Sequence, residues 1–522
     1  MFGTRAQLQN GRVKPLLLFY LVLAAVIWLA RGWILAGSFQ NVVLVLLGLA
    51  VFGITGVILG NWRTGVYFFL AWLLFEDLAR KFLGNGTALF FGKDALVAMV
   101  YLSLLKARSL EKVVTFRPPF LLPLGLFILL GIAQVFNSGS PSILYGILGM
   151  KLYFYYIPLL FVGYAMLRDE ADLRRFLAIN MGLAGLIALL GIVQSVVGQS
   201  FLSPKTLDPD LELLGNLTRY SPSGAAVSRP TSVFVSDGRF AHYLILTFII
   251  GAGAAGYLLL RTKRGRKLVF ASLALVGLAG MMSGSRGCAS YIAISALVLS
   301  AGLLWGAPPR AAETYRLFKA IRRTAIVIAL SLALGAVLFP QAIGARWSLY
   351  VETLDPRSSN YEVPYRAWDY PVHNLLLALT DPDWLIGHGI GTQSLGVQYV
   401  ARLTGAAANA ALPRFWVEEG YGTMITEFGI LGPILWLGWT LSFIYAGWKA
   451  ALRVKGTATF PVALSILWFG FLLLFPITFA GISPYQNFVL NAYFWLLAGV
   501  LFRLPTLTMQ HPLQAANSIR SS

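Results

Sequence analysis

Long apolar runs recur along the whole chain and are separated by short polar segments. Each run is long enough to cross the hydrocarbon core of a bilayer, which needs about 20 residues of helix. The predicted spans cover about 16–36, 40–60, 64–79, 87–105, 119–137, 146–166, 175–197, 238–260, 267–284, 288–305, 324–341, 426–447, 459–480 and 486–503. The pattern therefore predicts an all-α polytopic membrane protein, with about 14 transmembrane helices in one integral membrane domain over residues 1–522.

The basic residues of the short connections support this number of spans and set its orientation. With the N-terminus in the cytoplasm, alternate connections are cytoplasmic, and these connections carry the Lys and Arg clusters, as the positive-inside rule requires. Examples are the clusters around Arg264, Arg322 and Lys449. One span more or fewer would place several clusters outside, so both termini are expected in the cytoplasm. The weakest stretch is 74–94, where charged residues interrupt the apolar pattern.

The composition excludes soluble protein classes. Of the 522 residues, 57% are hydrophobic and only 12% are charged, about half of the 25% charged residues in average soluble domains. The net charge of +20 lies in clusters between apolar runs, which favours contact with anionic membrane lipids over binding of nucleic acid. The single cysteine, Cys288, excludes an internal disulfide and a cysteine-based metal site.

Two predicted outer connections are long, at 198–237 and 344–421. The second mixes charged residues with scattered Trp, Tyr and Leu, and its segment 366–377 has partial helical periodicity. Loops beyond about 15 residues are usually functional or disordered, and this composition is too apolar for disorder. We therefore expect a partly helical catalytic loop at 344–421 and place the chemistry on the outer face.

Three arginines on the predicted outer face are candidates for binding an anion. Arg286 lies in the turn Ser-Gly-Ser-Arg-Gly at 283–287 between two apolar spans. An arginine there is costly unless it snorkels or meets an anion, and its guanidinium suits phosphate. Contact with lipid phosphates explains Arg286 equally well. Arg229 and Arg239 precede and begin the eighth span; both could neutralise an anionic substrate, although helix anchoring is the better interpretation for Arg239.

The large loop ends in two carboxylates, Glu418 and Glu419, at the head of the twelfth span. Paired carboxylates raise each other's pKa, which would suit proton abstraction from a sugar hydroxyl. The alternative is an acidic first helical turn that complements the helix dipole.

The remaining polar features of the large loop are weaker signals. The Gly-X-Gly-X-Gly sequence at 387–391 follows no predicted strand, so we interpret it as a tight turn rather than a dinucleotide fingerprint. His373 and His388 are of a kind more often found as plain loop residues than as catalysts. With four histidines and no His-x-x-x-His pair, we expect no metal site.

These segments, in this order, resemble the superfamily of O-antigen ligases and of O-antigen and exopolysaccharide polymerases in bacterial envelopes. The matching segments are 92–96, 149–157, 229–231, the turn at Arg286, Arg366, the Gly-rich turn and 427–432. The resemblance implies a GT-C-like glycosyltransferase in the bacterial inner membrane, with its active site facing the periplasm. It also implies glycan transfer from an undecaprenyl-diphosphate carrier without a metal, cofactor or nucleotide sugar.

The resemblance also implies roles for individual residues. Arg286 and Arg366 would bind the diphosphate, with Glu418 as the base or acceptor-orienting group. Further substrate-binding residues would be Lys151, Arg229, Arg239, His373, His388, Glu419 and Tyr421.

One departure from the family pattern favours the polymerase branch. The ligases typically place His-Asn nine residues before the closing glutamate, whereas Glu418 and Glu419 occupy that position here. We therefore expect polymerisation of undecaprenyl-diphosphate-linked repeat units, with a chain-length regulator and a flippase as partners. The alternatives are a ligase that transfers glycan to lipid A core or protein, and a lipid-linked oligosaccharide flippase. A flippase would concentrate charges along a central path between spans.

The predicted orientation can be tested by labelling single cysteines in a Cys288→Ser background. Gly215→Cys and Gly405→Cys should react with a membrane-impermeant maleimide in cells with a permeabilised outer membrane, because both positions lie in predicted outer loops. Gly265→Cys should stay unlabelled, and labelling there would invert the topology.

Overall fold

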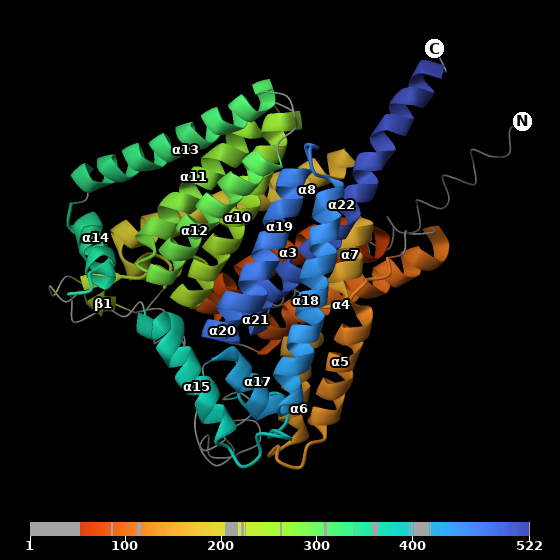
Figure 1. The fold of residues 1–522 in the computed structure, drawn as a ribbon, viewed down its shortest axis with the longest axis vertical. Coiled ribbons are helices and arrows are strands. Elements are labelled where there is room, and N and C mark those ends of the chain that lie inside the picture. The colour runs from red at the N-terminus through yellow and green to blue at the C-terminus, as the bar shows by residue number, and fades with distance from the viewer. Residues whose placement is uncertain are drawn as a thin grey trace, which may run out of the picture. The chain divides into compact units, whose positions relative to one another are not determined.

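The computed structural model describes residues 53–520 in a mostly helical fold (Figure 1). Its gaps are 85–86, 112–115, 204–217, 221–223, 225, 262–263, 307–310, 339, 358–363, 396, 398–399, 401–416 and 418. The predicted span at 16–36 lies outside the described residues, as does most of the span at 40–60.

The chain divides into two compact units. The first comprises residues 1–70 and 94–110, and the second comprises 71–93 and 111–522. Helix α3 (Trp62–Leu83) begins in the first unit, which also holds most of α4 (Thr87–Glu111). There the Ser103 hydroxyl donates a 2.9 Å hydrogen bond to the carbonyl of Ile58. All other described elements belong to the second unit.

The helices of the second unit follow the apolar runs of the sequence. They are α5 (Leu121–Val135), α6 (Ile143–Phe154), α7 (Leu159–Met166), α8 (Glu170–Val197), α10 (Asp237–Arg261), α11 (Arg266–Met282), α12 (Arg286–Trp305), α13 (Ala311–Leu338), α14 (Pro340–Leu354), α15 (Tyr370–Leu379), α17 (Gly420–Phe428), α18 (Leu431–Arg453), α19 (Phe460–Leu472), α20 (Thr478–Ala480), α21 (Ser483–Gln486) and α22 (Phe488–Arg520). A 3₁₀ turn η1 (Gln199–Phe201) and π-helical segments η2 (Tyr365–Asp369) and η3 (Leu473–Ile477) complete the helical elements. Strands β1 (Thr218–Tyr220) and β2 (Ala226–Ser228) form an antiparallel hairpin in which Arg219 lies opposite Val227.

Six helices of the described chain are long and apolar enough to cross a membrane. They are Ile143–Met166, Glu170–Val197, Asp237–Arg261, Arg286–Trp305, Phe460–Ala480 and Phe488–Thr508. The expectation of an all-α fold with membrane-spanning character is confirmed at this level.

Several predicted spans differ from the structure at proline and glycine residues. The span predicted at 146–166 corresponds to the membrane-length segment Ile143–Met166, within which a turn at 155–158 separates α6 from α7, since Pro158 has no amide hydrogen to continue the helix. The span predicted to begin at 426 instead begins with α18 at Leu431, because Gly429 (φ 72°) ends the separate helix α17. The span predicted at 324–341 is part of the longer α13, and Pro340 starts α14.

Helix α10 forms the centre of the second unit. It packs against α11, α12 and α19, and most of its side chains are buried (Figure 1). Close packing elsewhere depends on small residues: a Cβ on Gly163 of α7 would lie 2.0 Å from the Leu496 carbonyl of α22, and one on Gly499 would lie 2.1 Å from the Leu160 carbonyl. Glycines that let backbones approach are typical of helix packing in membranes.

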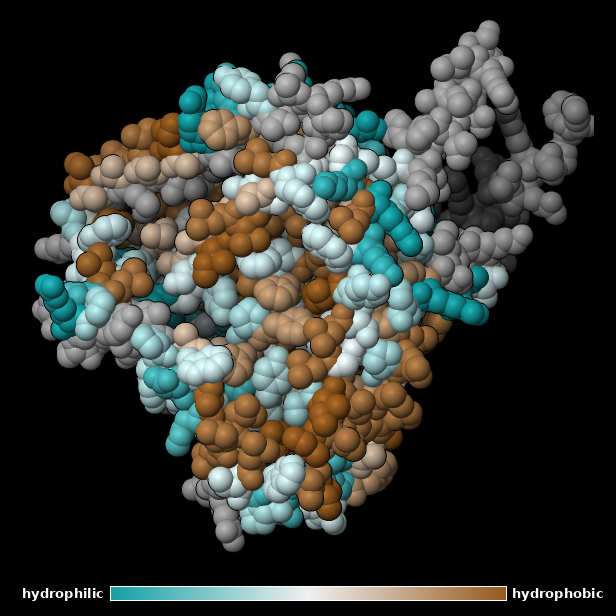
Figure 2. All heavy atoms as spheres, viewed as in Figure 1, coloured by the Kyte–Doolittle hydropathy of each residue, from teal (hydrophilic) through white to brown (hydrophobic). Residues whose placement is uncertain are grey.

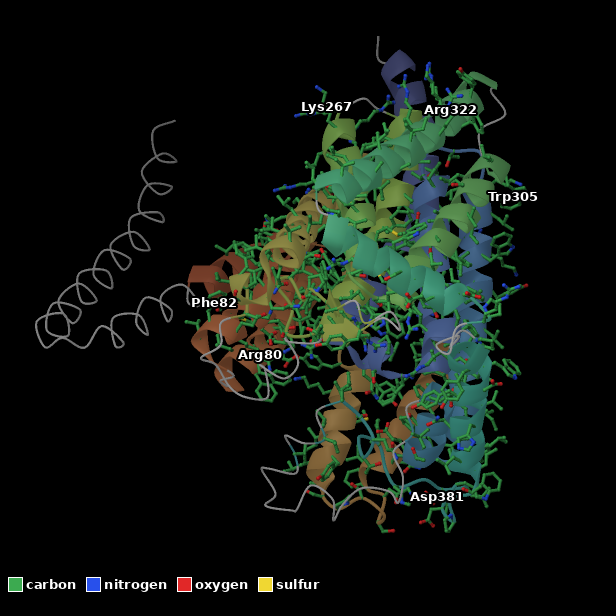
Figure 3. All side chains as sticks on the ribbon, turned by 90° about the vertical axis from the view of Figure 1, so that its left-hand side faces the viewer. Arg80, Phe82, Lys267, Trp305, Arg322 and Asp381 are labelled. Atoms are coloured by element: carbon green, nitrogen blue, oxygen red, sulfur yellow. The ribbon has the colours of Figure 1, made fainter. Side chains whose placement is uncertain are left out.

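Apolar side chains cover the outward faces of α5 and α18. Leu122, Leu129, Ile434 and Leu441 are all exposed, and Figure 2 shows apolar side chains gathered over these helices. Such a surface suits contact with lipid chains. Basic and acidic positions lie at opposite ends of the second unit: Figure 3 shows Lys267 of α11 and Arg322 of α13 at one end and Asp381 at the other.

A buried cluster of charged residues explains the polar interruption at 74–94. The Asp77 carboxylate accepts hydrogen bonds from Arg80 Nη1 (3.0 Å) and from Arg239 Nη1 of α10 (2.7 Å). Glu76 Oε1 lies 3.0 Å from Lys93 Nζ, and all five side chains except that of Arg239 are almost fully buried. The charges therefore tie α3 to the start of α10.

The segment that leads into α10 is fixed by the same cluster. Lys81 Nζ donates to the Thr231 hydroxyl (2.8 Å) and to the Ser232 carbonyl (2.9 Å). Gln194 Oε1 accepts from the amides of Thr231 (2.9 Å) and Ser232 (2.7 Å). Ser232 has φ 50°, a conformation that non-glycine residues keep only where their surroundings determine it. These contacts set the path of the chain from Arg229 into α10.

Removal of the central carboxylate should destabilise the protein. Asp77→Ala deprives the buried Arg80 and the partly buried Arg239 of this carboxylate, and breaking one partner of a buried ion pair costs about 3–5 kcal/mol. The free energy of unfolding in mixed detergent micelles measures the loss.

A surface ion pair with an exposed arginine and a half-buried aspartate offers a control. Asp172 pairs with Arg168, whose side chain is 64% exposed, so Asp172→Ala should lose at most about 1 kcal/mol. Equal losses in the two variants would show that the Asp77 pairs contribute no more than a surface salt bridge.

Candidate functional site

A cavity of about 380 Å³ lies in the second unit beside the N-terminal turns of α10, α12 and α17. Its polar lining consists of His242, Tyr291, Gln393, Thr423 and Ser483. The rest of the lining comes from Val417 and from the connection between α19 and α22, at Ile477 and 480–484. Five segments far apart in the sequence therefore bring hydroxyl, amide and imidazole groups to one space.

His242 and Tyr291 are the titratable side chains of this lining. His242 lies in the second turn of α10, and Tyr291 lies in the second turn of α12. The charged groups that act on His242 electrostatically are Asp237 and Arg229. These two groups form an ion pair in which Arg229 Nη1 lies 2.6 Å from Asp237 Oδ2.

The structure brings Arg229 to the turn that carries Arg286. Gly284 (φ 65°) lies so close to this segment that a Cβ on it would be 2.9 Å from Val227 Cγ1 and 3.3 Å from Arg229 Cγ. Ser285 caps α12 by accepting a hydrogen bond from the Cys288 amide (3.3 Å), and the half-buried Arg286 is the first residue of that helix. Two of the predicted anion-binding arginines thus lie where the cavity-lining helices α10 and α12 begin.

Arg346 supports this turn, although the sequence did not single it out. Its Nε donates to the Met282 carbonyl (2.8 Å), and its Nη2 donates to the Ser195 hydroxyl (2.6 Å) and the Ser228 carbonyl (2.9 Å). Arg346 therefore joins α14 to α8, to the end of α11 and to β2. Sequence patterns do not reveal this role because its acceptors are mostly backbone carbonyls remote in the chain.

Glu419 is the N-cap of α17. Its two carboxylate oxygens accept hydrogen bonds from the amides of Tyr421 (2.8 Å) and Gly422, and its side chain is fully buried. Burial raises the pKa of Glu419 to about 7, while the two amide hydrogen bonds act in the opposite direction. The geometry is that of the capping alternative. Glu418, the predicted base, lies outside the described residues.

Aromatic contacts bring the segment of Arg366 to the edge of the cavity. Phe479, which precedes the lining residues at 480–484, has its ring 6.3 Å from that of Tyr421 and 6.0 Å from that of Trp368. Arg366, in the same π-helical segment as Trp368, is exposed and lies over the Tyr370 ring at 5.2 Å. The segment predicted to be helical is confirmed as α15 and η2.

Glu427 positions the part of the cavity lining that contains Gln393 and Val417. Its fully buried carboxylate accepts hydrogen bonds from the Tyr153 hydroxyl (2.9 Å), the Ser394 hydroxyl (2.8 Å) and the Gln393 amide (2.9 Å). The Gln393 side chain in turn accepts from the Val417 amide (3.1 Å). Glu427 is the first residue of the resemblance motif at 427–432, and its hydrogen bonds position the polar lining.

The glycine-rich segment forms the tight turn predicted from the sequence. Gly387, Gly389 and Gly391 all have positive φ values, between 78° and 100°. A Cβ on Gly391 would lie 2.0 Å from the Tyr145 carbonyl of α6. The glycines therefore allow the loop to pack directly on the helix.

Other predicted site residues lie away from the cavity lining. Arg239 pairs with Asp77, as the anchoring interpretation expects, and Lys151 Nζ lies over the Phe90 and Phe91 rings at 4.6 and 4.5 Å. His373 is exposed on α15. Lys151 and Arg239 lie near the same charged cluster of α3 and α4, because Lys93 Nζ lies over the Phe90 ring (4.0 Å) beside Lys151 and over the Phe488 ring (4.4 Å) beside Arg239.

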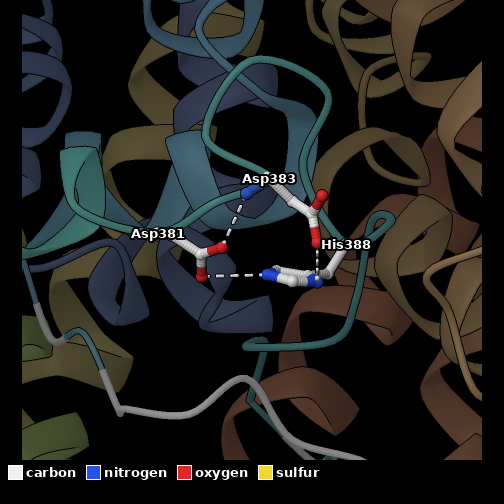
Figure 4. A group of neighbouring side chains, drawn as sticks. All are labelled: Asp381, Asp383 and His388. Atoms are coloured by element: carbon white, nitrogen blue, oxygen red, sulfur yellow. Dashed lines mark hydrogen bonds and ion pairs between the residues drawn. The ribbon is translucent and has the colours of Figure 1, made fainter.

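His388 belongs to a separate group with Asp381 and Asp383 (Figure 4). Its Nε2 lies 2.9 Å from Asp381 Oδ2, and its Nδ1 lies 3.8 Å from Asp383 Oδ2. Within the described part of the chain, these are the side chains that could hold a metal ion together, with one ligand atom each within 4.8 Å of the others. Asp381 also accepts a hydrogen bond from the Asp383 amide (2.9 Å), so these contacts also stabilise the turn.

No family model and no curated protein matches this chain. Its function is therefore inferred from the residues and their geometry.

The buried cap predicts a pH dependence of stability. The folded protein holds the Glu419 proton up to pH about 7, whereas the ordinary pKa is 4.5. The folded state thus binds this proton more tightly, and the stability from this group falls as the pH rises from 4.5 to about 7. Glu419→Gln should remove this decrease, measured as the difference between wild-type and variant unfolding midpoints across that range. Parallel pH profiles would contradict the assignment.

Proposed function

We propose that the protein is a glycosyltransferase of the bacterial inner membrane that polymerises undecaprenyl-diphosphate-linked repeat units on the periplasmic side. The observation that carries this proposal is the cavity where α10, α12 and α17 begin, with its histidine, tyrosine, amide and hydroxyl lining. Convergent polar groups in a concave site are typical of small-molecule binding. The Arg229 and Arg286 segments beside these helices suit a diphosphate.

The proposed architecture is GT-C-like, with about 14 spans and a large periplasmic loop over 344–421. The six apolar helices of the described chain support a membrane-embedded protein. The basic positions Lys267 and Arg322 lie at the end of the second unit opposite Asp381, as a cytoplasmic and a periplasmic side would require (Figure 3). On this orientation the cavity is reached from the periplasm.

In the proposed reaction, a sugar hydroxyl of the incoming unit attacks the anomeric carbon of the lipid-linked donor. The bond from that carbon to the diphosphate oxygen breaks, and the electron pair leaves with the carrier diphosphate. Arg286 and Arg366, joined by Arg229, would hold the negative charge that develops on the diphosphate, which is where fixed positive groups lower the barrier most. The polar lining would orient the two sugars.

Two alternatives remain, and one has a structural observation in its favour. Glu418 and Glu419 occupy the position where the resembling ligases have a histidine. For this reason we rank ligation second, after polymerisation. Transport is favoured by the buried charges of α3, since ionisable groups between spans often mark a transport path. However, Asp77, Arg239 and Lys81 are bound in a network that ties helices together, so we rank transport third.

Deletion of the gene tests the proposal. Single repeat units on the carrier should accumulate in the deletion strain, and plasmids carrying Arg286→Ala or Arg366→Ala should fail to restore polymer. The corresponding lysine variants should restore it poorly, because lysine keeps the charge but loses the two-pronged guanidinium. The readout is the size distribution of extracted lipid-linked glycans.

Arg322→Ala provides the control, because Arg322 is exposed at the opposite end of the second unit (Figure 3). It should restore polymer fully. Long carrier-bound polymer in the deletion strain would instead indicate a ligase. Normal polymer from both alanine variants would show that Arg286 and Arg366 do not bind the diphosphate and serve only as interfacial anchors.

A further inference from the structure

His242 and Tyr291 are the titratable side chains of the cavity lining, and the proposed reaction gives neither a part in proton transfer. His242 reaches the cavity from α10 and shares the lining with Tyr291 of α12, Gln393, Thr423 of α17 and Ser483. His242 is half-buried and is part of the cavity lining.

We propose that His242 is the general base of the transfer, a role that rests on the proposed function. The imidazole would accept the proton of the attacking hydroxyl as the new bond forms between that oxygen and the anomeric carbon. The old bond to the diphosphate oxygen breaks with its electron pair, so the products are the extended glycan, the carrier diphosphate and an imidazolium. The imidazolium then releases its proton to water and restores the enzyme.

The charges around His242 suit this role. Asp237, at the start of α10, would stabilise the imidazolium that forms, whereas Arg229, which pairs with Asp237 at 2.6 Å, acts in the opposite direction and favours release of the proton. The other facing titratable group is Tyr291, and the lining residues of α17 and of 477–484 carry no charge.

The described carboxylates near the cavity are less suited to this step. Both oxygens of Glu419 are bound to the amides that begin α17, and Glu427 accepts three hydrogen bonds from Tyr153, Ser394 and Gln393. Both side chains are fully buried. Either carboxylate would have to break these contacts to reach a substrate hydroxyl.

The test uses the full-length protein in liposomes. The probe is the lipid-linked glycan that accumulates in the gene-deletion strain, and the readouts are kcat and KM as functions of pH. Wild-type kcat should rise with pH along one acidic limb, because the base must lose its proton before it can accept the proton of the attacking hydroxyl. His242→Gln should lower kcat by about 10²–10⁴-fold, the usual contribution of a general base, with a smaller effect on KM and no such limb. Added imidazole should restore part of the rate of His242→Ala.

Two controls separate chemistry from folding and from a competing base. His511→Gln changes a histidine in the last part of α22 and should match wild type. Glu418→Gln should keep the acidic limb if His242 is the base. Unfolding midpoints of the His242 variants should equal that of wild type.

The failures of the two proposals are distinguishable. If the wild-type protein does not extend the lipid-linked glycan, the proposed function fails. If the wild type is active, a normal rate or a retained acidic limb in His242→Gln overturns the base assignment. Loss of the limb in Glu418→Gln, or a folded His242→Ala variant that imidazole does not rescue, overturns it equally.

Discussion

The geometry of the cavity depends on the buried carboxylate of Asp77. Two arginines converge on it, Arg80 from its own helix and Arg239 from α10. A buried ion pair is stable only while its partners stay in place, so these contacts allow one position of α10 relative to α3. His242 lies three residues after Arg239, less than one helical turn along α10. The charged network thus determines where the imidazole meets the cavity.

The predicted helices succeeded where the signal was local. Apolar runs identified the helices at 175–197 and 238–260. In each of them the backbone hydrogen bonds are made within one segment, so the local sequence is sufficient to predict the helix. The predictions missed the turn before Pro158 inside the span Ile143–Met166 and the helix end at Gly429, because one residue interrupts an apolar run without changing its hydropathy. Hydropathy averages over many residues, and a single missing amide hydrogen or positive φ does not alter the average.

The candidate site was predicted less completely than the fold. The sequence pointed to Arg229 and to the turn of Arg286, and the structure brings these two segments together. It also anticipated that Arg239 could serve as an anchor. His242, Gln393 and Ser483 were missed because a cavity wall is assembled from distant segments, and no local pattern marks its members. The sequence did offer one signal for the charged cluster that positions α10. Charges inside the apolar stretch 74–94 require partners elsewhere in the fold.

The size of the cavity has a consequence for a polymer-forming enzyme. A volume of about 380 Å³ is near the lower end of the range for sites that enclose one drug-sized molecule, roughly 300–1,000 Å³. On the proposed function, such a space encloses the sugars that flank the new bond and leaves the rest of the growing glycan in solvent. The site would then distinguish the chemistry of the junction but not how many units have already been joined. Control of product length would have to come from outside the catalytic centre, through a contact with the emerging chain or with a second protein.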